Sequence, residues 1–233
     1  MKQVLILLLV MLFLPLNSKR EVFNEFVSKF QVEATIPFFI TREEVIDFDA
    51  RAYFHGGNFA KIDSVFNPFI KLEFDTNIQK PNGVLGVNQS NYFKKLALSE
   101  DYTSLVYYVE SFCEGNNSYY SFILSTYDFE GAVISSITLG HYHNYIDYQD
   151  KLLEKLNYQR YDSLFFESDD IDHSFYYVDV SYIVSSEVVS KSKIRRTTKV
   201  EKELRVGEQD GPILETKLFT EEFSVQSDGT IHK

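Results

Sequence analysis

Apolar and polar residues alternate in two different patterns along this chain. Near the N-terminus, the segment KREVFNEFVSKFQ places five apolar side chains on one helical stripe: Val22, Phe23, Phe26, Val27 and Phe30. From about residue 91, aromatic and β-branched runs are separated by short turns rich in Gly, Asn and Asp. We therefore predict an α+β fold, in which an N-terminal amphipathic helix packs on a long curved antiparallel β-meander.

The stretch STYDFEGAVISSITLG, from Ser125 to Gly140, is typical of a β-hairpin. Asp128 suits the start of its turn, and Gly131 suits the left-handed position that closes a three-residue bulged loop. These residue types are explained by turn geometry alone, so the hairpin indicates fold rather than chemistry.

Two strand registers are compatible with this turn. A three-residue loop pairs Tyr127 with Val133 and Ile123 with Ile137, whereas a two-residue loop pairs Thr126 with Val133. A shift of one residue exchanges the two faces of a strand, so the apolar pattern leaves both registers open.

The first residues, MKQVLILLLVMLFLPLNSKR, are typical of a secretory signal peptide, with a basic Lys2, an apolar run and a helix-breaking Pro15. We predict a signal peptide over residues 1–18, with cleavage near Asn17–Ser18, and a single α+β domain over residues 19–233. The apolar run is short for a membrane span, and no cysteine follows it for lipid attachment. We expect an exported protein, periplasmic or extracellular, with no stable membrane anchor after cleavage. The alternative is an N-terminal core helix.

Composition narrows the classes of function. The chain has 233 residues and a net charge of −11, and such an acidic surface repels phosphate backbones, so we expect no nucleic-acid partner. The content of 21 Phe and 16 Tyr with no Trp favours sheet. The single cysteine, Cys113, excludes an intrachain disulfide and suits a small buried hydrophobe in a strand.

Three histidines are the candidates for a metal site. His141 and His143 are two residues apart, so they share one face of a strand, and His173 is a candidate third ligand. Asp147 is another candidate for that position. The alternative is that His141 and His143 are exposed residues after a strand that ends at Gly140.

An acidic run, ESDDID, has the oxygen-rich side chains that calcium prefers. Its candidate calcium ligands are Glu167, Asp169, Asp170 and Asp172. The alternation and glycine of an EF-hand loop are missing from it, so the alternative is a solvated acidic loop.

A basic segment, Lys191 to Arg205, stands out from the acidic chain. It is interpreted as a long exposed strand paired with LETKLFTEEF, which carries Glu215, Glu221 and Glu222. Its lysines would also protect an edge strand from pairing with other chains. The alternative is a patch that attracts an anionic partner.

Several of these motifs occur together in one group of proteins. The signal peptide, the opening FNEFVSKF…IPF, the strand pair SLVYYVES…SYYSFILSTYDFEGAVISSITLG and the tail FSVQSDGTIHK resemble uncharacterised exported proteins and lipoproteins of Gram-negative bacteria. The chain departs from the lipoprotein members because it lacks an acylated cysteine. The resemblance implies export and a β-rich fold, and it implies no activity or catalytic residue.

No nucleophile elbow, phosphate loop or other catalytic signature occurs in the sequence, so we assign no catalytic residue and no cofactor. We expect a non-enzymatic binding or scaffold role, with a protein or a glycan as the partner. The alternative is a hydrolase or metal-dependent enzyme without a recognised signature.

Overall fold

The computed structural model describes residues 18–30, 33–45, 60–70, 84–113, 118–148, 150–156, 176–206 and 209–233. Its elements, in chain order, are α2 (Lys19–Ser28), β1 (Glu33–Ala34), β2 (Phe38–Ile40), the 3₁₀ helix η1 (Ser64–Phe69), β3 (Val84–Leu96), β4 (Thr103–Cys113), β5 (Ser118–Tyr127), β6 (Val133–Asp147), the 3₁₀ helix η2 (Leu153–Lys155), β7 (Tyr176–Ser190), β8 (Lys193–Val206), β9 (Gln209–Val225) and β10 (Ile231–His232).

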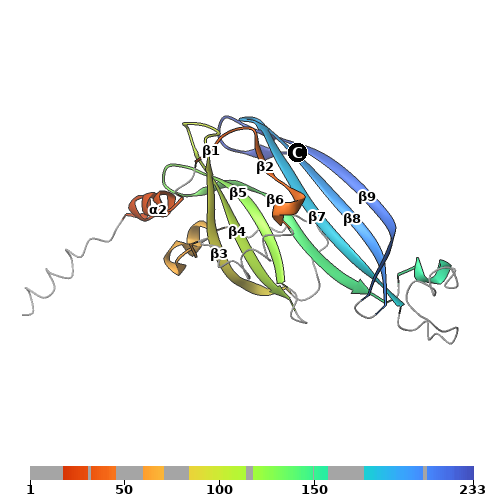
Figure 1. Ribbon diagram of the computed structural model, residues 1–233. Coiled ribbons are helices and arrows are strands. Elements are labelled where there is room, and N and C mark those ends of the chain that lie inside the picture. The colour runs from red at the N-terminus through yellow and green to blue at the C-terminus, as the bar shows by residue number, and fades with distance from the viewer. Residues whose placement is uncertain are drawn as a thin grey trace, which may run out of the picture.

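The strands form one large, mostly antiparallel open sheet, which curves along its length (Figure 1). Its order is β1-β3-β4-β5-β6-β7-β8-β9-β10, and β2 pairs with β7 outside this path. Strands β3 to β9 follow each other in chain order, so the predicted antiparallel meander is confirmed. The described part of the chain is mostly β with few helices, and the helical share is smaller than an α+β class implies.

Helix α2 begins at a capping box. The Ser18 hydroxyl accepts a hydrogen bond from the Glu21 backbone N–H, and the Glu21 carboxylate accepts one from the Ser18 N–H. The helix carries Phe23 and Phe26, which are both buried, and the ring centroid of Phe23 lies 5.2 Å from that of Tyr127 on β5. These rings belong to an apolar cluster that also includes residues of η1 and β4.

The turn between β5 and β6 has the three-residue loop, which is one of the two loops that the sequence left open. Tyr127 pairs with Val133, and Gly131 adopts a positive φ of 79°. The Asp128 carboxylate accepts hydrogen bonds from the backbone N–H groups of Glu130 and Ala132, at 2.9 and 2.8 Å. The local sequence alone dictates this geometry, because Gly tolerates the left-handed position and Asp caps the turn.

One pair of the predicted hairpin register is wrong. A β-bulge follows the Tyr127–Val133 pair, so Leu124 rather than Ile123 lies opposite Ile137. Both faces of β5 are buried: Ile123 and Tyr127 lie in the cluster with α2, whereas Leu124 lies in a second cluster on the opposite face. The apolar pattern could not select a single core face, because the strand has two.

The sheet divides at Gly140. Strand β6 pairs with β5 up to Tyr142 and with β7 from His141 onward. Toward its C-terminal end, β7 pairs with β2 instead of β6. A Cβ atom on Gly140 would lie 2.5 Å from Cγ2 of Ile40 and 2.9 Å from Cγ2 of Val45. Gly140 therefore gives room for the β2 segment to pack against β6. The expectation that the strand ends at Gly140 is wrong, because β6 continues to Asp147.

The C-terminal hairpin reaches back across the fold. Gly229, in the turn between β9 and β10, has a φ of 89°, and its carbonyl accepts a 2.7 Å hydrogen bond from the Thr126 hydroxyl of β5. This contact helps to enclose the largest apolar cluster, which draws side chains from β2 to β9. Among the helices that the structure describes, none has the length and apolar character needed to cross a membrane.

Candidate functional site

The structure brings together two of the three histidines predicted as metal ligands. His141 and His143 project from the same face of β6 and are 1 % and 2 % exposed. Nε2 of His141 lies 2.7 Å from Nδ1 of His143, and Nδ1 of His141 lies 2.7 Å from Oγ of Ser121 on β5. The alternative of two exposed histidines is wrong, because β6 runs on through the middle of the sheet.

His143 is packed against aromatic rings. Its imidazole stacks on the Tyr182 ring of β7, with centroids 4.7 Å apart and planes within 5° of parallel. Burial lowers the pKa of His143 to about 4, so its imidazole is neutral near pH 7. Burial and the neighbouring Tyr182 phenol raise the pKa of Tyr145, on the same face, to about 12.

The hydrogen bond between His141 and His143 uses Nε2 of His141 and Nδ1 of His143, the two nitrogens that would face a metal ion shared by the rings. A metal could bind there only after one ring turned away from the other, since a lone pair that accepts a hydrogen bond is not free for a metal. Within the described ranges, no three His, Cys, Asp or Glu side chains are grouped to hold a metal ion. His173 and the calcium candidates Glu167, Asp169, Asp170 and Asp172 lie outside the described residues, so those predictions remain untested.

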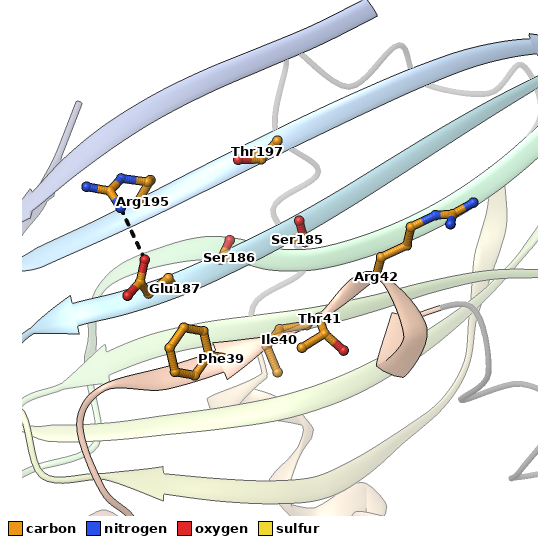
Figure 2. Close-up of a pocket in the computed structure, with 9 residues that line it drawn as sticks. All are labelled: Phe39, Ile40, Thr41, Arg42, Ser185, Ser186, Glu187, Arg195 and Thr197. Atoms are coloured by element: carbon orange, nitrogen blue, oxygen red, sulfur yellow. Dashed lines mark hydrogen bonds and ion pairs between the residues drawn. The ribbon is translucent and has the colours of Figure 1, made fainter. Parts of the chain in front are cut away.

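A groove of about 300 Å³ lies where β2 joins β7. Its lining comes from β2 and the turn after it, from β7 and from β8: Phe39, Ile40, Thr41, Arg42, Ser185, Ser186, Glu187, Arg195 and Thr197. Figure 2 shows these side chains along neighbouring strands, with Arg42 extended away from the others. Arg195 and Thr197 belong to the basic segment that the sequence singled out, whereas the lining residues of β2 and β7 were not predicted as site residues.

Strand register arranges the groove in two rows. In the first row, Phe39 is opposite Glu187, which is opposite Arg195 on β8. In the second row, Ser185 is opposite Thr197, and Thr41 follows β2 next to them. An aromatic ring and an ion pair therefore border a strip of hydroxyl groups.

The groove is accessible and carries charge of both signs. The Phe39 residue is 49 % exposed, and the Arg195 guanidinium donates to the Glu187 carboxylate at 3.2 Å. The Arg42 side chain is half exposed and lies 3.5 Å from the Glu201 carboxylate. Because the Arg195–Glu187 pair lies at the surface, it contributes little to stability.

The basic segment forms part of a charged ladder next to the groove. β8 pairs with β9 as predicted, and Arg195, Arg196 and Lys202 lie opposite Glu222, Glu221 and Glu215. The idea that its lysines protect an edge is wrong, because β8 lies between β7 and β9, and β9 is the outer strand. The Arg196 side chain is 2 % exposed, and its guanidinium lies over the Phe223 ring.

Comparison with known proteins finds no family model, no curated protein and no solved structure that matches this chain.

Sequence reasoning had one indirect signal for the groove. The segment TREE contains a capping box, in which Thr41 Oγ1 accepts from the Glu44 N–H and Glu44 accepts from the Thr41 N–H. This box ends β2 and starts a helical turn, so it holds Arg42 at the end of the groove. The pairing of β2 with β7 had no signal, because it joins three residues to a strand distant in sequence.

Proposed function

We propose that this protein is exported and binds a glycan in the groove at the junction of β2 and β7, without catalysing a reaction on it. The observation that carries the proposal is the strip of hydroxyl groups on Thr41, Ser185 and Thr197, bordered by the Phe39 ring. Hydroxyl groups both donate and accept hydrogen bonds, which suits a ligand that itself consists of hydroxyl groups.

Phe39 would supply the apolar contact that a sugar ring needs. A pyranose presents one face of C–H groups, and an aromatic side chain can cover that face while hydroxyls at the ring edge meet polar groups. The Glu187–Arg195 pair offers a carboxylate acceptor and guanidinium donors beside that ring. The groove, at about 300 Å³, is at the lower end of ligand pocket sizes, which suits a short stretch of one or two sugar units.

The N-terminal helix fits this role as a cover for the face of the sheet under β4 and β5. We infer that α2 packs there through Phe23 and Phe26, whose rings lie 5.2 and 6.4 Å from that of Tyr127. With that face covered, the β2–β7 groove is a recessed polar surface of the described residues that stays open to a ligand. The helix starts next to the proposed cleavage point, so processing at Asn17–Ser18 would leave Ser18 in place as its cap.

Export is tested by the N-terminus of the processed protein. Mass spectrometry of secreted or periplasmic material should find a chain that begins near Ser18. An intact Met1 in the cytoplasm would contradict export and would leave the binding proposal to be judged separately.

Glycan binding is tested with an array of defined oligosaccharides, followed by calorimetry on any that bind. We expect Phe39→Ala to weaken binding at least tenfold, and Thr197→Val to weaken it several-fold, because each removes one kind of contact. Phe129→Ala is the matched control, since Phe129 is 57 % exposed but lies in the β5–β6 turn. The proposal fails if no oligosaccharide binds, or if Phe39→Ala binds as well as Phe129→Ala.

A further inference from the structure

Strand β9 has an outer edge that is long and apolar. On one side it pairs with β8 from Gln209 to Ser224, and on the other side the only described strand, β10, reaches Ser224 and Val225. Before Ser224, the backbone N–H and C=O groups of alternate residues, those not directed toward β8, therefore face outward from the described sheet. Figure 1 shows β9 as the outermost long strand at one side of the molecule. An exposed edge of this length is a template for pairing with another strand.

The exposed side chains of β9 are unusually apolar for such an edge. Ile213, Leu218 and Phe219 are 58 %, 65 % and 52 % exposed, and no other described strand carries three large apolar side chains with such exposure. Natural proteins usually blunt a free edge with charges or a short strand. Over this segment β9 combines the charges of Glu215 and Lys217 with these three exposed apolar side chains, and this mixture suits pairing with a complementary strand.

The sequence of this segment is complementary to itself. ILETKLF, from Ile213 to Phe219, reads apolar, apolar, acidic, Thr, basic, apolar, apolar around Thr216. If two copies pair antiparallel about Thr216, Glu215 of one lies opposite Lys217 of the other, and Leu214 lies opposite Leu218. The flanking Ile213 and Phe219 form two further apolar pairs across the junction. Opposite charges and apolar pairs across strands both stabilise a sheet.

Other registers of the same pairing are less favourable. Centring on Glu215, Lys217 or Leu218 places like charges opposite each other. A register centred on Phe219 places Lys217 opposite Glu221. The Glu221 side chain is only 16 % exposed and already forms ion pairs with Arg196 and Lys233 in its own chain. The register about Thr216 alone joins accessible charges of opposite sign.

We propose that two copies of this chain associate through their β9 edges, antiparallel about Thr216, so that their sheets join across a twofold axis. The interface is isologous, because each copy contributes the same strand. A junction of two strands buries little area compared with a large obligate interface, so the dimer dissociates on dilution. This inference is independent of glycan binding, since the groove lies on β2, β7 and β8.

The first measurement is the mass in solution, by analytical ultracentrifugation over a concentration series. The protein, expressed with its own N-terminal segment, should shift from the mass of one chain to twice that mass as concentration rises. Glu215→Lys and Lys217→Glu should each remain monomeric, because each places like charges at both central pairs. Glu130→Lys, a charge reversal in the β5–β6 turn, should dimerise like the natural protein.

The decisive measurement mixes the two monomeric variants. Glu215→Lys then supplies lysines at both positions and Lys217→Glu supplies glutamates, so the mixture should form a heterodimer. Because a misfolded variant cannot recover an interface on mixing, this result separates lost contacts from lost folding, even though Glu215 also contacts Lys202 and Lys217 in its own chain at 3.9 and 3.1 Å. A monomeric natural protein, a dimer that survives in both variants, or a monomeric mixture of folded variants would overturn the proposal.

Discussion

Nε2 of His141 lies 2.7 Å from Nδ1 of His143, between strands that bury both rings. A hydrogen bond needs one N–H and one lone pair, so the two facing nitrogens share one proton. The Ser121 hydroxyl completes the chain on the far side of His141 and can act as donor or acceptor. Burial favours the uncharged state of His143, and a second proton between the two facing nitrogens would break their contact.

The first prediction is that the folded protein becomes less stable as the pH is lowered, because of His143. Burial lowers the pKa of His143 in the folded protein to about 4, whereas an unfolded chain has a pKa of 6.5. Between these values the unfolded state binds the proton and the folded state does not, so the stabilisation is complete above pH 6.5 and decreases toward pH 4. The loss is about 3 kcal/mol in the free energy of unfolding. Urea unfolding at a series of pH values measures it.

The variant His143→Asn separates this effect from other titrating groups. Asn keeps an acceptor near the position of Nδ1 but does not titrate, so the variant should lose less stability than the natural protein from pH 7.5 to 4.5. His232→Asn is the control, because His232 is exposed on β10. Parallel pH profiles for His143→Asn and the natural protein would contradict the assignment.

The second prediction concerns Gly131 and Gly229, the two glycines that have a positive φ in the described part of the chain. Gly131→Ala should cost more free energy of unfolding than Gly229→Ala. Both substitutions force an alanine into the left-handed region, at roughly 1 kcal/mol. A Cβ on Gly131 would also lie 2.5 Å from the Phe23 ring, whereas on Gly229 the nearest atoms are 3.1 Å away. We expect a further 1–3 kcal/mol, on the order of an overpacking cost, for Gly131→Ala.

The comparison between the two glycines also tests how α2 sits on the sheet. In a Phe23→Ala background, Gly131→Ala should cost less than in the natural background, because the ring atoms at 2.5 and 2.7 Å are gone and only Cβ of residue 23 stays close, at 2.8 Å. Thermal unfolding of the four variants measures this. Equal costs for the two glycines in the natural background would mean that Phe23 does not press on the turn.

The elements that could be predicted from the sequence are those with local causes. The turn at Asp128–Gly131 needs a cap and a residue that accepts positive φ, and both are present within four positions. The pairing of β8 with β9 follows from opposite charges on neighbouring strands. The bulge after Tyr127 was not predictable, because it depends on packing against clusters on both faces of β5.

The candidate sites were harder to predict, because they form between distant segments. The burial of His141 and His143 contradicts the alternative in which the strand ends at Gly140 and both rings are exposed. In the structure, the missing side chain of Gly140 leaves the space in which Ile40 packs beside β6. The groove depends on the same insertion, since Phe39 reaches Glu187 only after β2 has paired with β7. No periodicity within one segment reports such a long-range contact.

The last prediction tests this insertion at Gly140. Gly140→Ala would put a Cβ 2.5 Å from Cγ2 of Ile40, and neither the sheet nor the β2 segment can move freely, so the substitution should cost about 2–3 kcal/mol in stability. Asn144→Ala, at an exposed position of the same strand, is the control and should change stability little.

A double-mutant cycle with Ile40→Ala assigns that cost to the contact. Ile40→Ala alone opens a cavity and destabilises by about 2–5 kcal/mol. Combined with Gly140→Ala, the total should be at least 1 kcal/mol smaller than the two single effects together, because the new methyl group occupies space that Ile40 has left. Additive effects in urea unfolding would show that Gly140 is required for another reason, such as backbone freedom at the point where β6 changes partners.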